Sequence, residues 1–333
     1  MILFLLLLGA DLLYQNILWK KDIAVHADIM ENYWAVDPEC QALYFGESSN
    51  FHRAKNDTTK YRISHMIDSE LDQIKIGTVD NAGIHAGTYR AVLQNIEESS
   101  KVKILIVTMN LRSFSAGWRY ALGENYLSKT ETMLSTPFPL LNRFLVSLKY
   151  YDHQSDSERL AQCQNAWKTE KFKIPNFQYE NVHNWDSAMA WQEWMNRNPH
   201  LNEENIPLAC HYIKNFAFEI NPTTNERIAD FDEFMKISVS KNFTVIFNIL
   251  AENMEQVNKL VGQELIYLME KNRDFLIDRY ERQGAIVVDN LYAIPYSMFV
   301  DRDWPTEHYT REGKAIIAKN IAQYLKQIIK QKH

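Results

Sequence analysis

The chain has 333 residues, of which 46% are hydrophobic and 23% charged, so it can bury a large core and is not a disordered protein. Its formal net charge of -6 lacks the basic footprint that phosphate backbones require, so nucleic acid is not expected as a main partner. No metal or cofactor is expected, because the three cysteines form no CxxC pair and His52, His65 and His85 lack the spacing of metal ligands.

The N-terminal residues 1–21 are the least typical of a soluble protein. A dense apolar run over residues 1–10 stops at Asp11, and Trp19 and the basic pair 20–21 follow. The run is shorter than the ~20 residues of a spanning helix and lacks the positive start of a signal peptide. Tryptophan and lysine at its end are typical of a membrane boundary, so we favour a signal or membrane-anchor remnant over an apolar helix packed on the domain. The protein is then expected to be extracytoplasmic or membrane-anchored, with possible membrane association through this segment.

Five apolar segments further along have the length and pattern of buried strands, and helical patterns alternate with them. The strands are expected over residues 42–45, 74–79, 103–109, 243–250 and 285–288. Residues 111–242 break this alternation as a long, mostly helical insertion after the third strand. Alternating strands and helices imply a parallel sheet covered on both faces. We therefore predict a three-layer α/β/α fold with a five-stranded, flavodoxin-like parallel sheet, in one domain over residues 42–330.

Polar residues follow several of these strands at the edge where α/β proteins bind ligands. Gly46-Glu47-Ser48 follows the first strand, residues 81–87 the second and Asn110 the third, and His308 comes after the fifth. Ester chemistry needs a nucleophile, a base and donors for an oxyanion, and these residue types supply all three. Each also has a plain structural interpretation. Ser48 can cap a helix, a loop glycine can permit a turn, Asn110 can cap the next segment, and His308 can be a surface residue.

These segments, in this order, resemble the motifs of the SGNH (GDSL-type) hydrolase superfamily. Phe45-Gly46-Glu47-Ser48 looks like its Gly-Asp-Ser block with glutamate in place of aspartate, and residues 81–88 look like its Asn/Gly block. Only Asn110 remains of its third block. In the last block His308 is retained, whereas Pro305 stands where the family has its acid. The resemblance covers roughly residues 42–110 and 243–330, outside the insertion.

The resemblance implies a role for each matching residue. Ser48 would be the nucleophile, and its amide would be one donor of the oxyanion hole. Gly87, or alternatively Gly83, would give a second amide, and Asn110 would give its side-chain amide. His308 would act as the general base and then as the acid for the leaving group.

The acid that orients His308 is not fixed by the motifs. We prefer Asp303, which a bend at residues 304–305 would have to bring near the imidazole, and Asp301 is the fallback. A backbone carbonyl in place of an acid, leaving a Ser-His dyad, also stays open. Arg112 follows Asn110 closely and could meet an anionic substrate, although a structural arginine is an equal alternative.

The resemblance implies a serine hydrolase that acts on a small ester or an acylated glycan through an acyl-enzyme. A carbohydrate O-acyl esterase is favoured by the anchor-like start and by the tryptophan-rich insertion, because tryptophan can stack on sugar rings. A plainer interpretation is that these side chains form the hydrophobic core of the insertion. The tryptophans are Trp118, Trp167, Trp185, Trp191 and Trp194. Two alternatives remain: an O-acyltransferase of cell-envelope polysaccharide, and a non-catalytic SGNH-like binding or assembly protein that has lost the acid.

Overall fold

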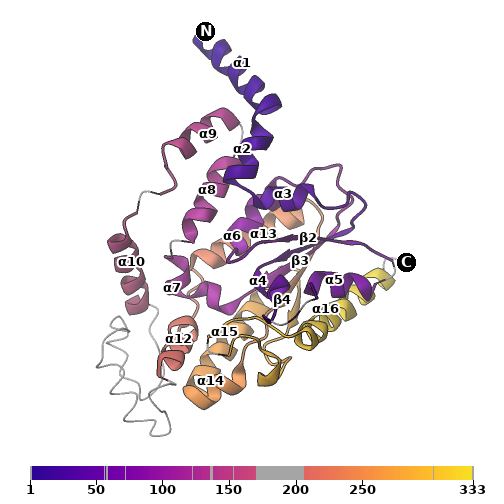
Figure 1. Cartoon of the computed structure of the whole chain (residues 1–333), viewed down its shortest axis with the longest axis vertical. Coiled ribbons are helices and arrows are strands. Elements are labelled where there is room, and N and C mark those ends of the chain that lie inside the picture. The colour runs from indigo at the N-terminus through magenta and orange to yellow at the C-terminus, as the bar shows by residue number, and fades with distance from the viewer. Residues whose placement is uncertain are drawn as a thin grey trace.

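The protein contains a five-stranded, all-parallel sheet with helices on both faces, which confirms the three-layer α/β/α prediction (Figure 1). The computed structural model describes residues 2–55, 57, 59–71, 73–121, 123–135, 138–152, 154–169, 206–302 and 304–331. The strands are β1 (Ala42–Gly46), β2 (Ile76–Asp80), β3 (Ile104–Met109), β4 (Thr244–Ile249) and β5 (Ile286–Asp289). Each lies within two residues of its expected bounds.

The strand order is β2-β1-β3-β4-β5, the flavodoxin-like order. The chain leaves β1 toward β2 on one side and then passes back to β3 on the other. The carboxyl ends of β1 and β3 therefore flank the point where the direction of winding reverses. Open α/β sheets bind ligands at this point. Ser48 follows β1 and Asn110 follows β3, so both predicted site residues lie there.

The two faces of the sheet bury different side chains because successive residues of a strand point to opposite sides. Leu43 and Phe45 of β1 pack in the core under α6, α13 and α15, whereas Ala42 and Tyr44 pack in the core under α5 and α16. The helices of the sheet layers are α5 (Ile63–Ser69), α6 (Ala86–Gln94), α13 (Glu226–Ser240), α14 (Met254–Leu260), α15 (Gln263–Glu281) and α16 (Arg311–Gln331). Strands buried on both faces explain the continuous apolar runs of the sequence.

The long segment between β3 and β4 is helical where it is described. Its elements are a 3-10 helix (Leu111–Phe114), α7 (Ala116–Arg119), α8 (Glu124–Leu134), α9 (Pro139–Ser147), α10 (Asp156–Thr169) and α12 (Ile206–Phe216). Residues 170–205, and with them three of the tryptophans considered for sugar stacking, lie outside the described residues. α13, at the end of the segment, returns to the sheet, where the ring centroid of Phe234 lies 5.9 Å from that of Phe45.

The N-terminal helices precede the sheet. They are α1 (Ile2–Ile17), α2 (Trp19–His26) and α3 (Ile29–Trp34), and α1 points away from the rest of the molecule (Figure 1). Within α1, Asp11 and Tyr14 are the buried residues. Among the described residues no single helix has the length and hydropathy of a membrane span. Taken together, α1 and α2 have the length and hydropathy of a span, but a bend of 69° separates the two helices.

Candidate active site

Ser48 is presented at the sheet edge by a sharp turn between β1 and the short helix α4 (Ser48–Phe51). Glycine is required at position 46, because a Cβ added there would lie 2.6 Å from Cε1 of the Tyr44 ring. The cap residue of α4 is Glu47, whose side chain makes no capping bond, so Ser48 is not the capping serine that a plain structural interpretation would require. Its hydroxyl is left for another partner.

That partner is His308. The Oγ of Ser48 lies 2.9 Å from Nε2 of His308, across 260 residues of chain. On the other side of the ring, Nδ1 of His308 lies 2.5 Å from Oδ2 of Asp301. An Nδ1–H that donates to the carboxylate leaves Nε2 free to accept the hydroxyl proton, which is the tautomer a general base needs. The predicted Ser48–His308 pair is therefore brought together, and a carboxylate completes the chain of hydrogen bonds.

The carboxylate that contacts Nδ1 is Asp301, the fallback of the sequence analysis in place of the preferred Asp303. Asp303 itself lies outside the described residues. The physical reason is an antiparallel pairing inside the loop, in which Phe299 is bridged to Tyr309 and the Val300 N–H donates to the His308 carbonyl at 2.8 Å. Residues 301 and 308 then face each other across this pairing, so the separation of seven residues is closed by the loop fold.

A second imidazole, which the sequence did not single out for the site, lies against the first. The ring of His52 stacks on that of His308, with centroids 3.8 Å apart and planes 16° from parallel. Its Nε2 is 3.5 Å from Oδ2 of Asp301. Burial, and then the charge of His308, lower the pKa of His52 from its ordinary value. The signal in the sequence is spacing, because position 52 follows Ser48 by one helical turn.

The ligand atoms of His52, Asp301 and His308 lie within 4.8 Å of one another, which is close enough to surround a metal ion. The lone pairs of an imidazole lie in the ring plane, so two stacked, parallel rings do not aim their nitrogens at one point. One ring would have to turn before both could bind the same ion. The observed arrangement is that of a hydrogen-bonded triad with a stacked neighbour.

Asn110, the predicted side-chain donor of the oxyanion hole, lies beside the nucleophile turn. It is buried, and its Nδ2 donates to Oε1 of Glu47 at 2.8 Å. Its Oδ1 accepts the Arg112 N–H at 2.9 Å, so it also caps the 3-10 helix that follows β3. A primary amide carries two hydrogens, and one of them is used by Glu47. Asn110 thus has the position and the donor capacity for the role.

The two glycines considered as backbone donors lie before and within α6. The Gly87 N–H is directed at Nδ1 of His85, 3.4 Å away, which caps that helix. A side chain at position 87 would collide with Leu127, so close packing accounts for this glycine. Gly83 adopts a φ of +68° in the preceding turn, a conformation that favours glycine. A place for either amide in the oxyanion hole stays a prediction.

Buried ionisable residues adjoin the Ser48–His308 pair, among them Glu47 and Glu307, which are its neighbours in the sequence. Nη2 of Arg112 is 2.6 Å from Oε2 of Glu307, and its guanidinium lies 4.7 Å from the ring centroid of Trp118. Arg112, which the sequence offered as an anion contact, is thus mostly buried and ion-paired within the protein. Burial, and then the charge of Glu307, raise the pKa of Glu47 to about 8. The same two causes raise the pKa of Glu252 well above its ordinary value.

Lys314 fastens the segment after Ser48 to the last helix. This residue of α16 is buried, and its Nζ donates to the carbonyls of Asn50 at 3.2 Å, His52 at 2.5 Å and Tyr61 at 3.1 Å. A lysine that occupies the buried face of an amphipathic helix is unusual unless it is fully bonded. The sequence signal was a charge on the helix face that also carries Ile317, three residues later.

Asn50 fixes the same segment from the other side. Its Nδ2 donates to Oδ2 of Asp80 at 2.6 Å and to Oγ of Ser64 at 3.2 Å, and its Oδ1 accepts the Ser64 N–H at 2.9 Å. Arg62 in turn pairs with Asp80. Ser48 is therefore held by a turn whose next residues are bonded to β2, α5 and α16.

Comparison with known proteins gives a limited likeness. No protein-family model matches the chain, and no curated protein matches it. Among solved structures, it is similar to a member of the lipolytic protein G-D-S-L family from Veillonella parvula DSM 2008, with TM-score 0.36 and 7% identity, over 85% of this chain and 96% of that one. It is also similar to the lipase/acylhydrolase from Enterococcus faecalis, with TM-score 0.34 and 8% identity, over 86% and 96% of the two chains.

Both structures are described as lipolytic or acyl hydrolases, and the first carries the G-D-S-L name of the group that the sequence motifs resemble. At such low TM-scores and identities, the likeness carries no argument about what this chain does. The case for chemistry therefore stands on the geometry of Ser48, His308 and Asp301.

Proposed function

We propose that the protein is a serine hydrolase that cleaves an ester through an acyl-enzyme on Ser48. The observation that carries the proposal is the hydrogen-bonded chain from Ser48 Oγ to His308 to Asp301, at the ligand-binding edge of the sheet. A nucleophile, a base and an orienting acid in mutual contact are the parts that activate a serine hydroxyl.

The reaction follows from the positions of the protons. As Ser48 Oγ bonds to the ester carbonyl carbon, Nε2 of His308 takes the hydroxyl proton, and Asp301 balances the imidazolium through Nδ1–H. His308 then gives this proton to the alcohol oxygen as the ester C–O bond breaks, leaving the acyl group on Ser48. A water that loses its proton to His308 attacks the acyl-enzyme, and the returning proton restores Ser48 as the carboxylic acid leaves.

Negative charge on the carbonyl oxygen requires donors placed before the reaction begins. We assign this role to the Ser48 amide and to Nδ2 of Asn110, which lies against Glu47 next to the nucleophile. Each such donor typically contributes on the order of 100-fold or more to turnover. Gly87 or Gly83 would add a further amide.

Within this class we favour a carbohydrate O-acyl ester as substrate, with an O-acyltransferase of cell-envelope polysaccharide as the alternative. The support is the tryptophan-rich sequence of the insertion, of which Trp118 lies next to the site on Arg112. The non-catalytic alternative rests on the missing acid at Pro305 and on the glutamate in the Gly-Asp-Ser-like block. Asp301 supplies a carboxylate from a different position, which favours the catalytic proposal over this alternative.

We also propose that the protein associates with a membrane through α1 and works outside the cytoplasm. The proposal is supported by the exposure of the apolar side chains of α1 and by Trp19 and the lysine pair that follow it. An enzyme held in this way would meet esters at or near the membrane surface.

Hydrolysis of a short p-nitrophenyl ester tests the proposed reaction. The wild-type protein is expected to release p-nitrophenol, and Ser48→Ala to lose this activity. Ser49→Ala, which removes a hydroxyl from the neighbouring, fully buried residue, is the matched control and is expected to keep it. Incubation with an acetylated oligosaccharide then separates the two reactions, because an esterase releases free acetate whereas a transferase moves the acetyl group to another sugar.

A further inference from the structure

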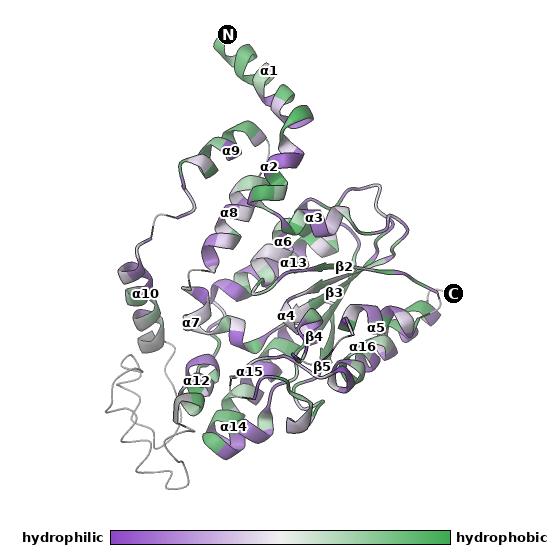
Figure 2. Cartoon of the chain, in the orientation of Figure 1, coloured by the Kyte–Doolittle hydropathy of each residue, from purple (hydrophilic) through white to green (hydrophobic). Residues whose placement is uncertain are grey.

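The first turns of α1 expose apolar side chains on every side. Residues 2–7 are six consecutive apolar residues (Figure 2). Their exposed fractions lie between 57% for Leu7 and 75% for Ile2. A helix that packs on a protein surface needs only one apolar stripe, whereas a helix that is apolar all round fits an environment that is apolar on all sides. This pattern favours lipid over a protein groove as the medium around α1.

A second helix, from the insertion, exposes an apolar stripe at the same end of the molecule. Leu141, Phe144 and Leu148 follow one another at i, i+3 and i+7 on and just after α9, and they are 51%, 57% and 62% exposed. The opposite face carries Asn142 and Val146, which are buried. α9 is therefore an amphipathic helix whose apolar face has no cover within the described chain.

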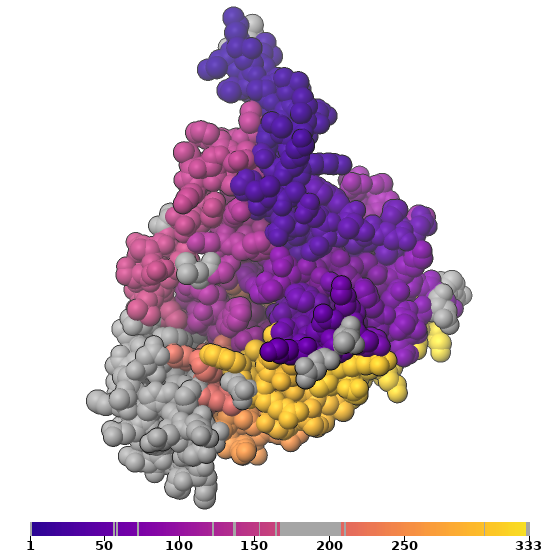
Figure 3. All heavy atoms as spheres, viewed as in Figure 1, coloured from indigo at the N-terminus to yellow at the C-terminus, as the bar shows by residue number. Residues whose placement is uncertain are grey.

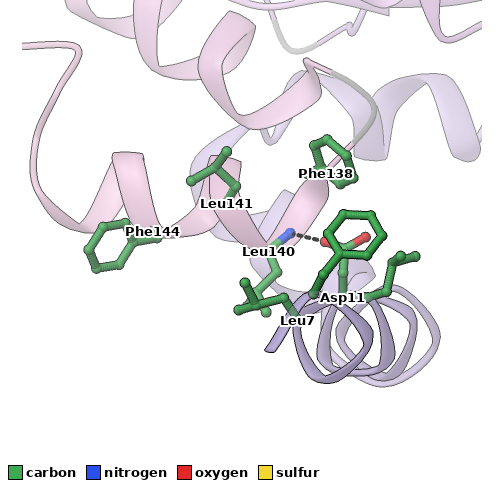
Figure 4. Close-up of a pocket in the computed structure, with 8 residues that line it drawn as sticks. Leu7, Asp11, Phe138, Leu140, Leu141 and Phe144 are labelled. Carbon is green, nitrogen blue, oxygen red and sulfur yellow. Dashed lines mark hydrogen bonds between the residues drawn. The ribbon is translucent and has the colours of Figure 1, made fainter. Parts of the chain in front are cut away.

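The two helices lie side by side and share a groove of about 580 Å³ (Figure 4). The groove is lined by apolar side chains of both helices, including Leu7, Phe138, Leu141 and Phe144. The surface view shows α1 projecting from the molecule with α9 against its base (Figure 3). The exposed apolar area is thus a single surface built by two segments that are more than a hundred residues apart in the sequence.

The one acid in this surface is already satisfied. Asp11 Oδ1 accepts the Leu140 N–H at 2.7 Å (Figure 4). Its Oδ2 accepts an N–H of Gln15 Nε2 at 2.7 Å. A carboxylate placed near lipid is tolerated when its oxygens are hydrogen-bonded. The Asp11–Leu140 bond also joins α1 to the start of α9, so the two helices present their apolar faces together.

The charges around the surface fit anionic headgroups. Lys20 and Lys21 are exposed just after α1, and Lys149 is exposed just after α9. Of the two basic residues in 138–151, Arg143 is paired with Asp22, and Lys149 is exposed. Basic residues beside an apolar surface add attraction to anionic lipids, and Tyr150, which is 64% exposed, is of a type enriched at the interface.

We propose that α1 and α9 form one bilayer-docking surface, in which α1 enters the hydrocarbon and α9 lies along the interface. The proposal rests on the membrane association proposed for α1 and adds a second contact made by the insertion. The partner is a lipid surface. Docking by two elements would fix the orientation of the domain above the membrane, which a single flexible anchor would not do.

Vesicle binding by the full chain tests this proposal. The probe is a vesicle of phosphatidylcholine and phosphatidylglycerol in equal amounts, with pure phosphatidylcholine for comparison. Leu141→Ser combined with Phe144→Ser removes the α9 contact, and Leu3→Ser combined with Leu6→Ser weakens α1. The matched control combines Val239→Ser and Tyr267→Ser, two exposed apolar residues of α13 and α15.

The α9 variant is expected to bind vesicles about tenfold or more weakly than wild type, because two apolar side chains no longer leave water. The α1 variant is expected to lose at least as much, and the control to bind like wild type. Hydrolysis of a soluble ester is expected to be unchanged in every variant. A loss of vesicle binding can then be distinguished from a failure of the catalytic proposal. Wild-type vesicle binding by the α9 variant would overturn the two-helix surface. A second result would also overturn it: the wild-type protein is a dimer in solution, and the α9 variant is a monomer that binds vesicles as wild type does.

Discussion

The imidazole of His52 lies flat against that of His308, with ring centroids 3.8 Å apart, while its Nε2 approaches the same Asp301 oxygen that binds His308. Because the pKa of His52 is lowered by burial and by the charge of His308, His52 is neutral at neutral pH. A neutral ring stabilises the orientation of His308 without repelling the imidazolium that forms during acyl transfer. We therefore propose that His52 is a positioning residue for His308, the proposed general base.

Replacement of His52 is expected to act on turnover and not on substrate affinity. His52→Ala should lower kcat by roughly tenfold or more, because a misplaced base reacts more slowly, and should leave KM nearly unchanged. His52→Phe keeps a flat ring on His308 and should recover part of the loss. Steady-state kinetics with a p-nitrophenyl ester measure both constants. An equal loss in the alanine and phenylalanine variants would argue against a role for stacking.

Asp301 is expected to be the acid that the reaction requires. Asp301→Asn should lower kcat by roughly a thousandfold or more, because the amide no longer holds Nδ1–H or balances the imidazolium. Asp303→Asn, at the position favoured by the sequence, is the matched control and should retain most of the activity. A reversed ranking of the two variants would show that the loop holds a different carboxylate during turnover.

Glu47 makes the stability of the protein depend on pH. Its pKa is raised from 4.5 to about 8, mainly by burial and then by the charge of Glu307. Between these values, Glu47 is ionised in the unfolded chain and protonated in the folded one, so folding takes up a proton. The contribution of Glu47 to the free energy of unfolding therefore falls as pH rises through this window.

Glu47→Gln keeps an oxygen acceptor for Nδ2 of Asn110 and carries no charge. We expect the variant to exceed wild type in free energy of unfolding by roughly 1–3 kcal/mol near pH 8 and to match it near pH 5. Urea unfolding at the two pH values measures the difference. Glu281→Gln, on an exposed part of α15, serves as the control and should change little at either pH. A glutamine variant that is less stable than wild type at both pH values would contradict a protonated Glu47.

Lys314 is expected to support both stability and activity. Lys314→Met leaves the buried carbonyls of Asn50, His52 and Tyr61 without this donor, which should lower the free energy of unfolding by roughly 2–4 kcal/mol. Activity should fall in the fraction that remains folded, because Lys314 ties the segment after Ser48 to α16. Lys326 lies on the same helix as Lys314 and forms an exposed ion pair with Glu70. Lys326→Met should lower the free energy of unfolding by no more than about 0.5 kcal/mol. Similar losses of free energy of unfolding in the two variants would contradict a special role for the bonds of Lys314 to the three carbonyls.

The sequence predicts well what depends on local patterns. The five strands follow from apolar runs of the right length, and the order of Ser48, Asn110 and His308 at strand ends places them at one sheet edge. Ile317, Ile321 and Leu325 recur at helical spacing in α16, and all three side chains are fully buried. In each case, a short segment contains the whole signal.

The sequence fails where a contact depends on packing between distant segments. Asp301 reaches His308 because the backbone of Val300 pairs with that of His308, and no sequence motif predicts this pairing. The ion pair of Arg112 with Glu307 joins residues 195 positions apart, so the arginine could not be distinguished from an exposed anion contact. The bond between Asn110 and Glu47 likewise joins residues 63 positions apart, and no local pattern predicts it.

Covalent labelling with a fluorophosphonate probe tests the central claim most directly. An activated serine displaces fluoride and forms a stable phosphonyl adduct, which peptide mass spectrometry assigns to one residue. We predict a single adduct on Ser48 that forms in wild type and in Ser49→Ala, is lost in Ser48→Ala and is strongly slowed in His308→Gln. Folded wild-type protein that takes up no label, or that takes up label at the same rate in Ser48→Ala, would contradict the proposed nucleophile.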